Sequence, residues 1–179
     1  MPKTRRNKKH KQKSQRAGSK QYKHGDITKL NEKHDGLHFF RKYGASPVEH
    51  EIAKILKNNP HPNIVKVYNV TKEYIDIEEV DPLPSMNKSN REKIISAAKS
   101  AKEHLQSLGI MYIDWKHDNM GIGDDGKYKL FDFDASGTTD GEDWKTKPEM
   151  WWSYKKAIKA ECKTPIEIDD FSFNEYFED

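Results

Sequence analysis

One segment, residues 112–134 (YIDWKHDNMGIGDDGKYKLFDFD), constrains this chain most, because it gathers oxygen-bearing side chains in a predicted hairpin. It holds six aspartates and one asparagine. Arms of alternating apolar residues flank Asp125-Gly126, and Asp-Gly between such arms is a strong signal for a two-residue turn. In that register Asn119 faces Asp132, with Cβ atoms roughly 4.5–5.5 Å apart. The sequence therefore predicts an amide oxygen beside a carboxylate.

This pairing predicts a metal site with acid–base chemistry close by. Mg²⁺ prefers oxygen ligands at about 2.0–2.1 Å and usually also binds water and phosphate oxygens, so Asn119 and Asp132 are candidate ligands. Asp114 precedes the hairpin, where it can orient a hydroxyl and accept its proton. Lys116 lies two residues further along an extended loop, so it projects to the same side and can steady a transferring phosphoryl group.

Residues 26–58 predict a hairpin followed by a helix. Asp35-Gly36 is again a hairpin turn signal, here between β-prone segments. Ser46 as N-cap, Pro47 at the first helical position and Glu49 three residues after the cap predict a helix that starts with a capping box. Apolar residues then recur at helical spacing, and the helix is predicted to end near residues 58–60.

The next residues predict two strands and a long helix. Residues 63–70 and 73–80 alternate apolar with polar side chains, which is typical of strands. Residues 89–109 carry an apolar stripe at helical spacing, with Ser89 and Glu92 as a second capping box. A strand-rich half with one helix therefore precedes a helical half, and the fold class is α+β.

The charge is distributed unevenly along the chain. Residues 1–23 hold ten Lys or Arg and no acid, whereas the remaining 156 residues hold 22 basic and 29 acidic residues, a net charge of −7. The basic segment is too polar to bury surface that would offset its ordering, so we expect a disordered tail. Its expected partner is a nucleic acid or an acidic protein surface, with binding that weakens steeply as salt rises.

The sequence resembles the protein kinase superfamily. YIDWKHDN followed by FDFD is similar to the catalytic loop H-R-D-x-K-x-x-N and the metal-binding D-F-G. HPNIVKVYNV is similar to the segment that joins the kinase C-helix to the fourth strand, EYIDIEEV to the fifth strand and hinge, and DDFSF to the start of a helix that braces the catalytic loop. After the basic tail at 1–23, which the charge distribution indicates, the resemblance implies a strand-rich N-lobe with one helix at 24–80 and a truncated helical C-lobe at 81–179.

The resemblance also implies roles for individual residues and for ATP with Mg²⁺ as cofactors. Asp114 would be the catalytic base, Lys116 the phosphate contact, and Asn119 and Asp132 the metal ligands. The nucleotide-binding residues would be Lys42 on a strand, its helix partner Glu51, and the hinge backbone from Glu78 to Val80. Arg41 is an alternative to Lys42, and Glu49 is an alternative to Glu51, although the capping box already accounts for Glu49.

Three features depart from the family. No G-x-G-x-x-G precedes the predicted third strand, so the loop that covers the phosphates is missing or replaced. Tyr112 and Ile113 stand where the family has histidine and arginine, which removes the arginine that receives an activation-loop phosphate. Asp134 stands where the family has the glycine of D-F-G, and it adds a carboxylate near the metal ligands.

Two functions are consistent with these residues. The first is a minimal Ser/Thr protein kinase that moves the γ-phosphate of ATP to a protein hydroxyl. The second is a catalytically weak or inactive kinase-fold binding module, such as a virion component, since short tail-bearing kinase-like proteins resemble those of large DNA viruses. The sequence has no long apolar run and no secretory signal, so we expect an intracellular protein of the cytoplasm or nucleus, or one packaged in a virion, and no membrane partner.

Overall fold

The computed structural model describes residues 27–83, 85–140 and 152–178; the basic segment 1–23 lies outside these ranges. Within them the protein is an α+β structure of antiparallel sheets and four α-helices. The strands are β1 (Ile27–His34), β2 (Leu37–Tyr43), β3 (Val67–Val70), β4 (Tyr74–Glu78), β5 (Asp81–Pro82), β6 (Ile110–Met111), β7 (Met120–Ile122), β8 (Tyr128–Leu130) and β9 (Gly137–Thr138). The α-helices are α1 (Pro47–Asn58), α2 (Arg91–Ser107), α3 (Trp152–Lys159) and α4 (Pro165–Phe177).

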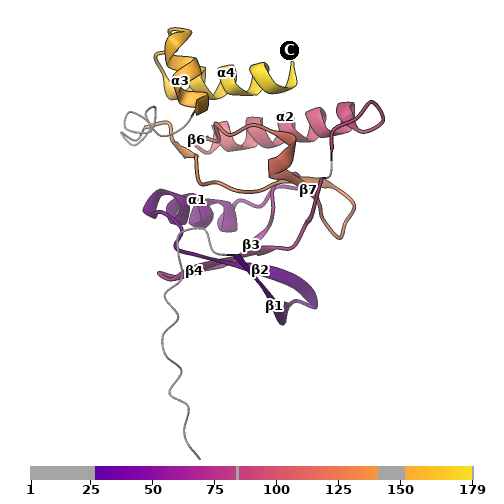
Figure 1. Cartoon of the computed structure of the whole chain (residues 1–179). Helices are drawn as coiled ribbons and strands as arrows, with labels where there is room; N and C mark the ends of the chain where they lie inside the picture. The colour runs from indigo at the N-terminus through magenta and orange to yellow at the C-terminus, as the bar shows by residue number, and fades with distance from the viewer. Residues whose placement is uncertain (1–26, 84, 141–151, 179) are drawn as a thin grey trace, which may run out of the picture.

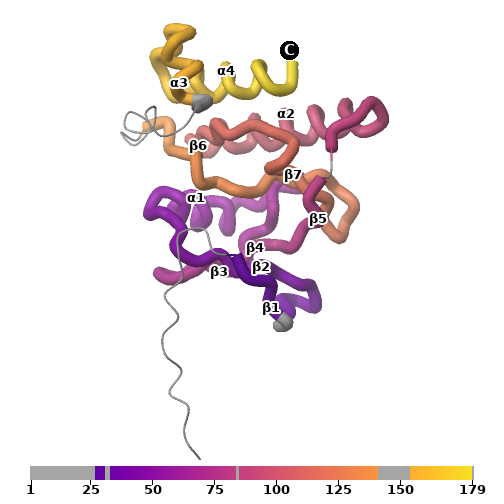
Figure 2. Tube along the Cα trace, in the orientation of Figure 1, coloured from indigo at the N-terminus to yellow at the C-terminus, as the bar shows by residue number. Residues whose placement is uncertain are grey.

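The elements separate into two ends of the molecule. Figure 1 shows the four-stranded sheet, in the order β1-β2-β4-β3, and α1 at one end, with α2, α3 and α4 at the other. Between them run the β7–β8 hairpin and the strand β5, which pairs with β7 (Figure 2). Among the described residues, no helix has the length and apolar character needed to cross a membrane.

The first hairpin forms as its turn residues predict. Asp35 and Gly36 both have positive φ, 52° and 83°, as a tight two-residue turn between right-handed twisted strands requires. Strand β2 then pairs with β4 so that Lys42 lies opposite Ile75. Because neighbouring side chains of a strand point to opposite faces, only one of Arg41 and Lys42 can face α1.

Helix α1 begins where the sequence predicts, but half of its capping box is absent. The Ser46 hydroxyl accepts a hydrogen bond from the Glu49 N–H at 3.1 Å, and Pro47 is the first helical residue. The Glu49 side chain does not return to the cap, because it bonds to Lys42 on β2. The buried face of α1, which includes Ile52 and Leu56, packs into the main core.

Helix α2 begins one residue later than predicted. Its N-cap is Asn90, and the Ser89 hydroxyl donates instead to the Asn87 side chain at 2.7 Å. The capping box at Ser89 was therefore wrong, although the helix itself is confirmed. The apolar stripe of α2 is buried in the main core: Ile94, Ala98, Ala101 and Leu105.

The β7–β8 hairpin is shifted by one residue from the predicted register. Met120 pairs with Leu130, and Ile122 pairs with Tyr128. The loop has three residues rather than two, because the Gly123 N–H bonds to the Lys127 carbonyl at 3.0 Å and Gly126 takes a left-handed φ of 73°. Asn119 consequently pairs through its carbonyl with the Phe131 N–H at 3.0 Å, and it does not face Asp132 as predicted.

Candidate active site

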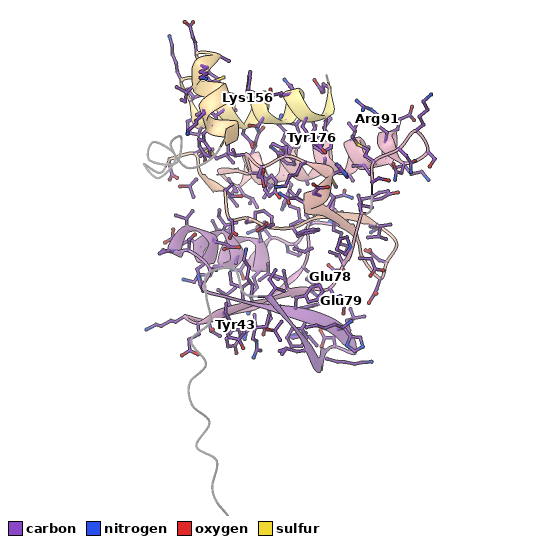
Figure 3. The ribbon with its side chains drawn as sticks, viewed as in Figure 1. Tyr43, Glu78, Glu79, Arg91, Lys156 and Tyr176 are labelled. Carbon is purple, nitrogen blue, oxygen red and sulfur yellow. The ribbon has the colours of Figure 1, made fainter. Side chains whose placement is uncertain are left out.

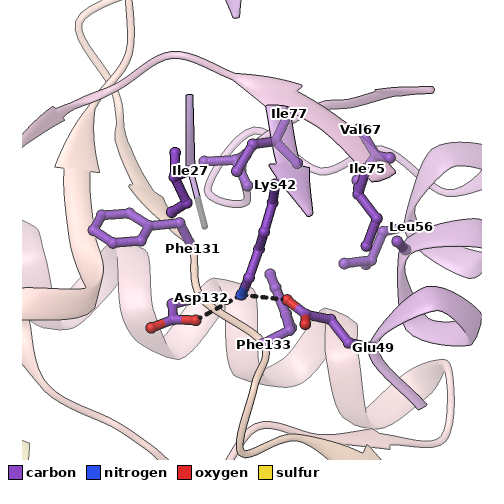
Figure 4. Close-up of a pocket in the computed structure, with 12 residues that line it drawn as sticks. Ile27, Lys42, Glu49, Leu56, Val67, Ile75, Ile77, Phe131, Asp132 and Phe133 are labelled. Atoms are coloured by element: carbon purple, nitrogen blue, oxygen red, sulfur yellow. Dashed lines mark hydrogen bonds and ion pairs between the residues drawn. The ribbon is translucent and has the colours of Figure 1, made fainter. Parts of the chain in front are cut away.

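Lys42 lies at the centre of a group of carboxylates between the sheet and α1. Its ammonium Nζ is 2.6 Å from Glu49 Oε1, 2.8 Å from Asp134 Oδ1 and 3.1 Å from Asp132 Oδ1. Figure 4 shows Lys42 reaching from its strand to a point between Glu49 and Asp132. Lys42 and Glu49 are each only 5% exposed, so this ion pair is deeply buried. We call Lys42, Glu49, Asp132 and Asp134 the lysine cluster.

Glu51 does not take part in the lysine cluster, and its expected pairing with Lys42 was wrong. Two residues along a helix turn the side chain by about 200°, so Glu51 lies nearly opposite Glu49 and is exposed. Arg41 is also excluded as the cluster's cation, because it faces the other side of the sheet. There its guanidinium bonds to both carboxylate oxygens of Asp76, at 2.6 and 2.9 Å.

Burial and neighbouring charges shift the pKa values of two members of the lysine cluster, Lys42 and Glu49. Burial lowers the pKa of Lys42, but the charges of Glu49 and Asp132 outweigh it, so the pKa is raised overall. Burial raises the pKa of Glu49 to about 7, and its hydrogen bond with Asp134 acts in the same direction, against the charge of Lys42. One ammonium therefore faces three carboxylates, and Glu49 takes up a proton at a higher pH than an ordinary glutamate does.

The donor set of this cluster fits a hard divalent cation. Glu49, Asp132 and Asp134 offer carboxylate oxygens that all lie within 4.8 Å of one another. Glu49 Oε2 is buried and has no hydrogen-bond partner among the described residues. With all three carboxylates ionised, the cluster carries two negative charges beyond the one that Lys42 balances. An Mg²⁺ ion would neutralise these and keep some of its waters or phosphate ligands.

A second group of polar side chains lies on the loop after β6. The Asp114 Oδ2 accepts hydrogen bonds from Lys116 Nζ at 2.6 Å and from Asn119 Nδ2 at 2.9 Å. Asn119 Nδ2 also donates to the Asp114 carbonyl at 3.0 Å, which holds the loop in a closed turn. The structure therefore brings together Asp114, Lys116 and Asn119, which the sequence had proposed on spacing. We call these three residues the loop cluster.

A buried carboxylate on α4 holds this loop in place. Asp169 Oδ1 accepts hydrogen bonds from the Tyr112 N–H, the Ile113 N–H and the Trp115 indole, at 3.0, 2.8 and 2.7 Å. Ile113 has a φ of 73°, a conformation that a β-branched residue adopts only when its surroundings enforce it. Asp169 supplies that enforcement, and it lies in the DDFSF motif compared above with a bracing helix. Burial raises the pKa of Asp169 above its usual value, and the hydrogen bonds from these donors offset only part of that rise.

Tyr112 connects the two clusters. Its ring is fully buried, and its hydroxyl donates to the carbonyl of Phe131, the residue before Asp132. Burial raises the pKa of this hydroxyl, and the negative charges of Asp132 and Asp114 raise it further. Asp132 has a φ of 62°, so the chain turns sharply after Phe131. Sequence reasoning treated Tyr112 only as a replaced histidine, and no local pattern revealed its position between the clusters.

A small apolar cavity lies behind Lys42. It has a volume of about 90 Å³, and its walls come from the sheet, α1 and the segment Phe131 to Phe133 (Figure 4). Glu78 and Val80 do not line it. The Glu78 N–H bonds to the Lys66 carbonyl at 2.8 Å, and its carboxylate bonds to Lys129 at 2.6 Å, so this side chain joins β4 to β8. Val80 is buried against Gly121.

Replacing Glu49 by glutamine should remove a pH dependence of stability. The pKa of Glu49 is raised from its usual 4.5 to about 7 in the folded protein. The folded state therefore binds this proton more tightly than the unfolded chain does. The proton bound to Glu49 therefore contributes most to the free energy of unfolding below pH 4.5, and this contribution falls as the pH rises to about 7. Between these two pH values, the free energy of unfolding of the natural protein should fall relative to that of Glu49→Gln by on the order of 3 kcal/mol at most.

Urea unfolding of both proteins at several pH values between about 4.5 and 8 measures this difference. The matched control is Glu51→Gln, which changes an exposed glutamate on the same helix and should give a difference that is flat with pH. A flat difference for Glu49→Gln as well would show that Glu49 ionises normally in the folded protein.

Comparisons with known proteins assign no family or function to this site. The sequence matches no protein-family model, and a search of curated proteins finds no significant match. The interpretation of the site therefore depends on the residues themselves. Of the predicted site residues, the structure gathers Asp114, Lys116 and Asn119 in one cluster, and Lys42 and Asp132 in the other. Glu51, Glu78 and Val80 lie outside both.

Proposed function

We propose that this protein is an ATP- and Mg²⁺-dependent phosphotransferase that moves the γ-phosphate to a protein hydroxyl, as a minimal protein-kinase-like enzyme. The observation that carries the proposal is the adjacency of the two clusters. The loop cluster offers a carboxylate and a lysine for the reacting groups, and the lysine cluster offers a cation and carboxylates for a metal-bound nucleotide. Tyr112 and the Asn119–Phe131 hydrogen bond join them.

Each residue has a role that follows from its contacts. Asp114 has one oxygen, Oδ2, held by Lys116 and Asn119, whereas Oδ1 has no hydrogen bond within the described residues. Oδ1 can therefore accept the proton of an attacking hydroxyl. The Lys116 side chain is 36% exposed, so its ammonium can move from Asp114 to a phosphoryl oxygen. Asn119 keeps the Asp114 side chain oriented in either case.

The lysine cluster is proposed to hold the nucleotide through its phosphates. A bound Mg²⁺ would neutralise phosphate charge and support in-line transfer. Asp132 and Asp134 would hold the ion, and Asn119, the other expected ligand, lies next to Phe131 at the same edge. Lys42 would then exchange a carboxylate contact for a phosphate oxygen. Under this proposal the residues up to Val80 form a kinase-like N-lobe, those from Asp81 onward form a shortened C-lobe, and Glu78 to Val80 connect them.

Transfer from radiolabelled ATP to a mixed protein substrate tests this function. We expect transfer that requires Mg²⁺ and is lost with EDTA, and an ATP-dependent rise in the melting temperature. Asp132→Asn should abolish both, because it removes a carboxylate from the proposed metal site. Asp124→Asn is the matched control, since Asp124 is exposed in the hairpin loop. Absence of both transfer and thermal shift in the natural protein would exclude the phosphotransferase.

The basic segment supports a further partner, either of the phosphotransferase or of an inactive binding module. Ten Lys or Arg without any acid in residues 1–23 can neutralise several phosphates of a nucleic acid. Affinity for a DNA or RNA oligonucleotide should then fall with salt, with a log–log slope of about −0.7 to −0.9 per phosphate contact. Deletion of residues 1–23 should remove the binding and the slope, as fluorescence anisotropy would show. Equal binding by the shortened chain would place the interaction elsewhere.

A further inference from the structure

All three hydrogen-bond donors of the Lys42 ammonium are occupied by carboxylates. A lysine ammonium carries three N–H donors and no acceptor. The Lys42 Nζ donates to Glu49 Oε1 at 2.6 Å. It also donates to Asp134 Oδ1 at 2.8 Å and to Asp132 Oδ1 at 3.1 Å. A phosphate oxygen can therefore bind Lys42 only if one of these carboxylates leaves.

The three carboxylates differ in how easily they can leave Lys42. The Glu49 side chain is only 6% exposed, and its departure would leave a charge unpaired in the interior, which is very costly. The side chains of Asp132 and Asp134 are 41% and 25% exposed, so water can solvate either carboxylate once it leaves. The exchangeable partners of Lys42 are therefore Asp132 and Asp134.

Asp134 holds Lys42 more firmly than Asp132 does. Its oxygen is closer to the ammonium, at 2.8 Å against 3.1 Å, and its side chain is the less exposed of the two. The attraction between opposite charges rises as their separation falls and as water is excluded. Of the two exchangeable carboxylates, Asp134 is therefore the stronger competitor for a phosphate oxygen at Lys42.

The excess of negative charge around Lys42 does not extend to the carboxylates that follow β4. Glu78 pairs with Lys129 at 2.6 Å and Glu79 with Lys29 at 2.5 Å, and Figure 3 labels both glutamates. Each of these carboxylates has a lysine of its own, whereas in the lysine cluster three carboxylates share one ammonium. The lysine cluster by itself therefore repels the anionic triphosphate of a nucleotide.

We propose that Asp134 is a built-in competitor for phosphate, which withholds Lys42 from a nucleotide until Asp134 binds a divalent cation. This proposal rests on the proposed phosphotransferase function and concerns the regulation of its nucleotide site. Without a cation, Asp134 stays bonded to Lys42 and excludes phosphate. When Asp132 and Asp134 turn to a divalent cation, Lys42 keeps Glu49 and gains a free N–H for a phosphate oxygen. Nucleotide affinity is thereby coupled to the cation.

Binding of ATP to the natural protein and to Asp134→Ala, measured by isothermal titration in excess EDTA and in excess Mg²⁺, tests the competitor. We expect the natural protein to bind ATP at least about 100-fold more weakly in EDTA than in Mg²⁺. In EDTA, Asp134→Ala should bind ATP about tenfold more tightly than the natural protein, because one N–H of Lys42 is free and one negative charge is gone. Asp124→Ala, which removes an exposed carboxylate of the hairpin loop, should keep both natural affinities.

Binding of Mn²⁺ without nucleotide tests the cation half of the proposal separately. Mn²⁺ shares the preference of Mg²⁺ for carboxylate oxygens, and electron paramagnetic resonance detects its free form. We expect the natural protein to bind Mn²⁺ and Asp134→Ala to bind it about tenfold more weakly. If the alanine variant does not fold, Asp134→Asn decides. It should shift both affinities in the same directions by smaller factors, because its amide oxygen still accepts a hydrogen bond from Lys42.

The possible failures are distinguishable. Equal ATP affinity of the natural protein in EDTA and Mg²⁺, or an ATP affinity in EDTA that Asp134→Ala leaves unchanged, overturns the competitor and leaves the phosphotransferase standing. Unchanged Mn²⁺ binding by Asp134→Ala overturns the release of Lys42 by a cation at Asp134. If the natural protein and Asp134→Ala bind no ATP in Mg²⁺ and transfer no phosphate, the competitor and the phosphotransferase function are both overturned.

Discussion

Replacing Asp114 by asparagine should lower kcat for phosphoryl transfer by about 10²–10⁴, the usual contribution of a general base. Asparagine keeps the shape of the side chain, but its amide cannot accept the proton of the attacking hydroxyl. Asp114 lies outside the lysine cluster, so the affinity for Mg²⁺ and ATP should stay within about twofold. The loss should therefore appear in kcat and not in nucleotide binding, which separates a role in chemistry from one in binding.

Single-turnover transfer and isothermal titration with ATP and Mg²⁺ measure the two quantities for Asp114→Asn. Asp118→Asn is the matched control, because Asp118 belongs to the same loop but its side chain is 69% exposed. It should retain the rate of the natural protein. A normal rate in Asp114→Asn would remove Asp114 from the mechanism and would favour the kinase-like binding module.

Replacing Asp169 by alanine should cost about 3 kcal/mol or more of the free energy of unfolding. Its Oδ1 accepts hydrogen bonds from the backbone of Tyr112 and Ile113 and from the Trp115 indole, all in the interior. Alanine leaves these buried donors unpaired, and each costs about 1–3 kcal/mol. The left-handed conformation of Ile113 also loses the contact that maintains it. Asp114 follows directly, so transfer activity should fall together with stability.

Urea or thermal unfolding measures this loss. Asp170→Ala is the adjacent control: Asp170 is partly exposed and bonds to Lys102 at 2.7 Å and to Gln106 at 2.9 Å. An ion pair near the surface contributes about 1 kcal/mol or less, so this variant should remain close to the natural protein. Similar effects for the two variants would mean that Asp169 does not brace the loop.

The features that sequence reasoning predicted correctly depend on neighbours along the chain. Asp35-Gly36 can form a tight turn because both residues tolerate positive φ, and the hairpin follows from that tolerance. Ser46 and Pro47 start α1 because a hydroxyl acceptor and a fixed φ suit the first turn of a helix. The spacing of Asp114, Lys116 and Asn119 likewise closes one short loop by itself.

The errors occurred where two local solutions compete and a distant contact decides between them. Asp125-Gly126 permits a two-residue turn or a three-residue loop, and the latter was adopted, with Lys129 opposite Gly121, where its ammonium reaches Glu78. Glu49 can complete a capping box or bond to Lys42. In the structure Glu49 bonds to the buried ammonium of Lys42, because an unpaired charge in the interior costs far more than a lost capping bond at a helix end.

The sequence by itself determined the α+β class, the positions of the main helices and hairpins, and the loop cluster, because each depends on residues within a few positions of one another. Only the tertiary structure decided that Lys42 meets Glu49, Asp132 and Asp134, that Tyr112 lies between the two clusters, and that Asp169 braces the loop. These contacts join residues from separate elements. Their existence depends on how the sheet, α1 and α4 pack, and no local propensity encodes that packing.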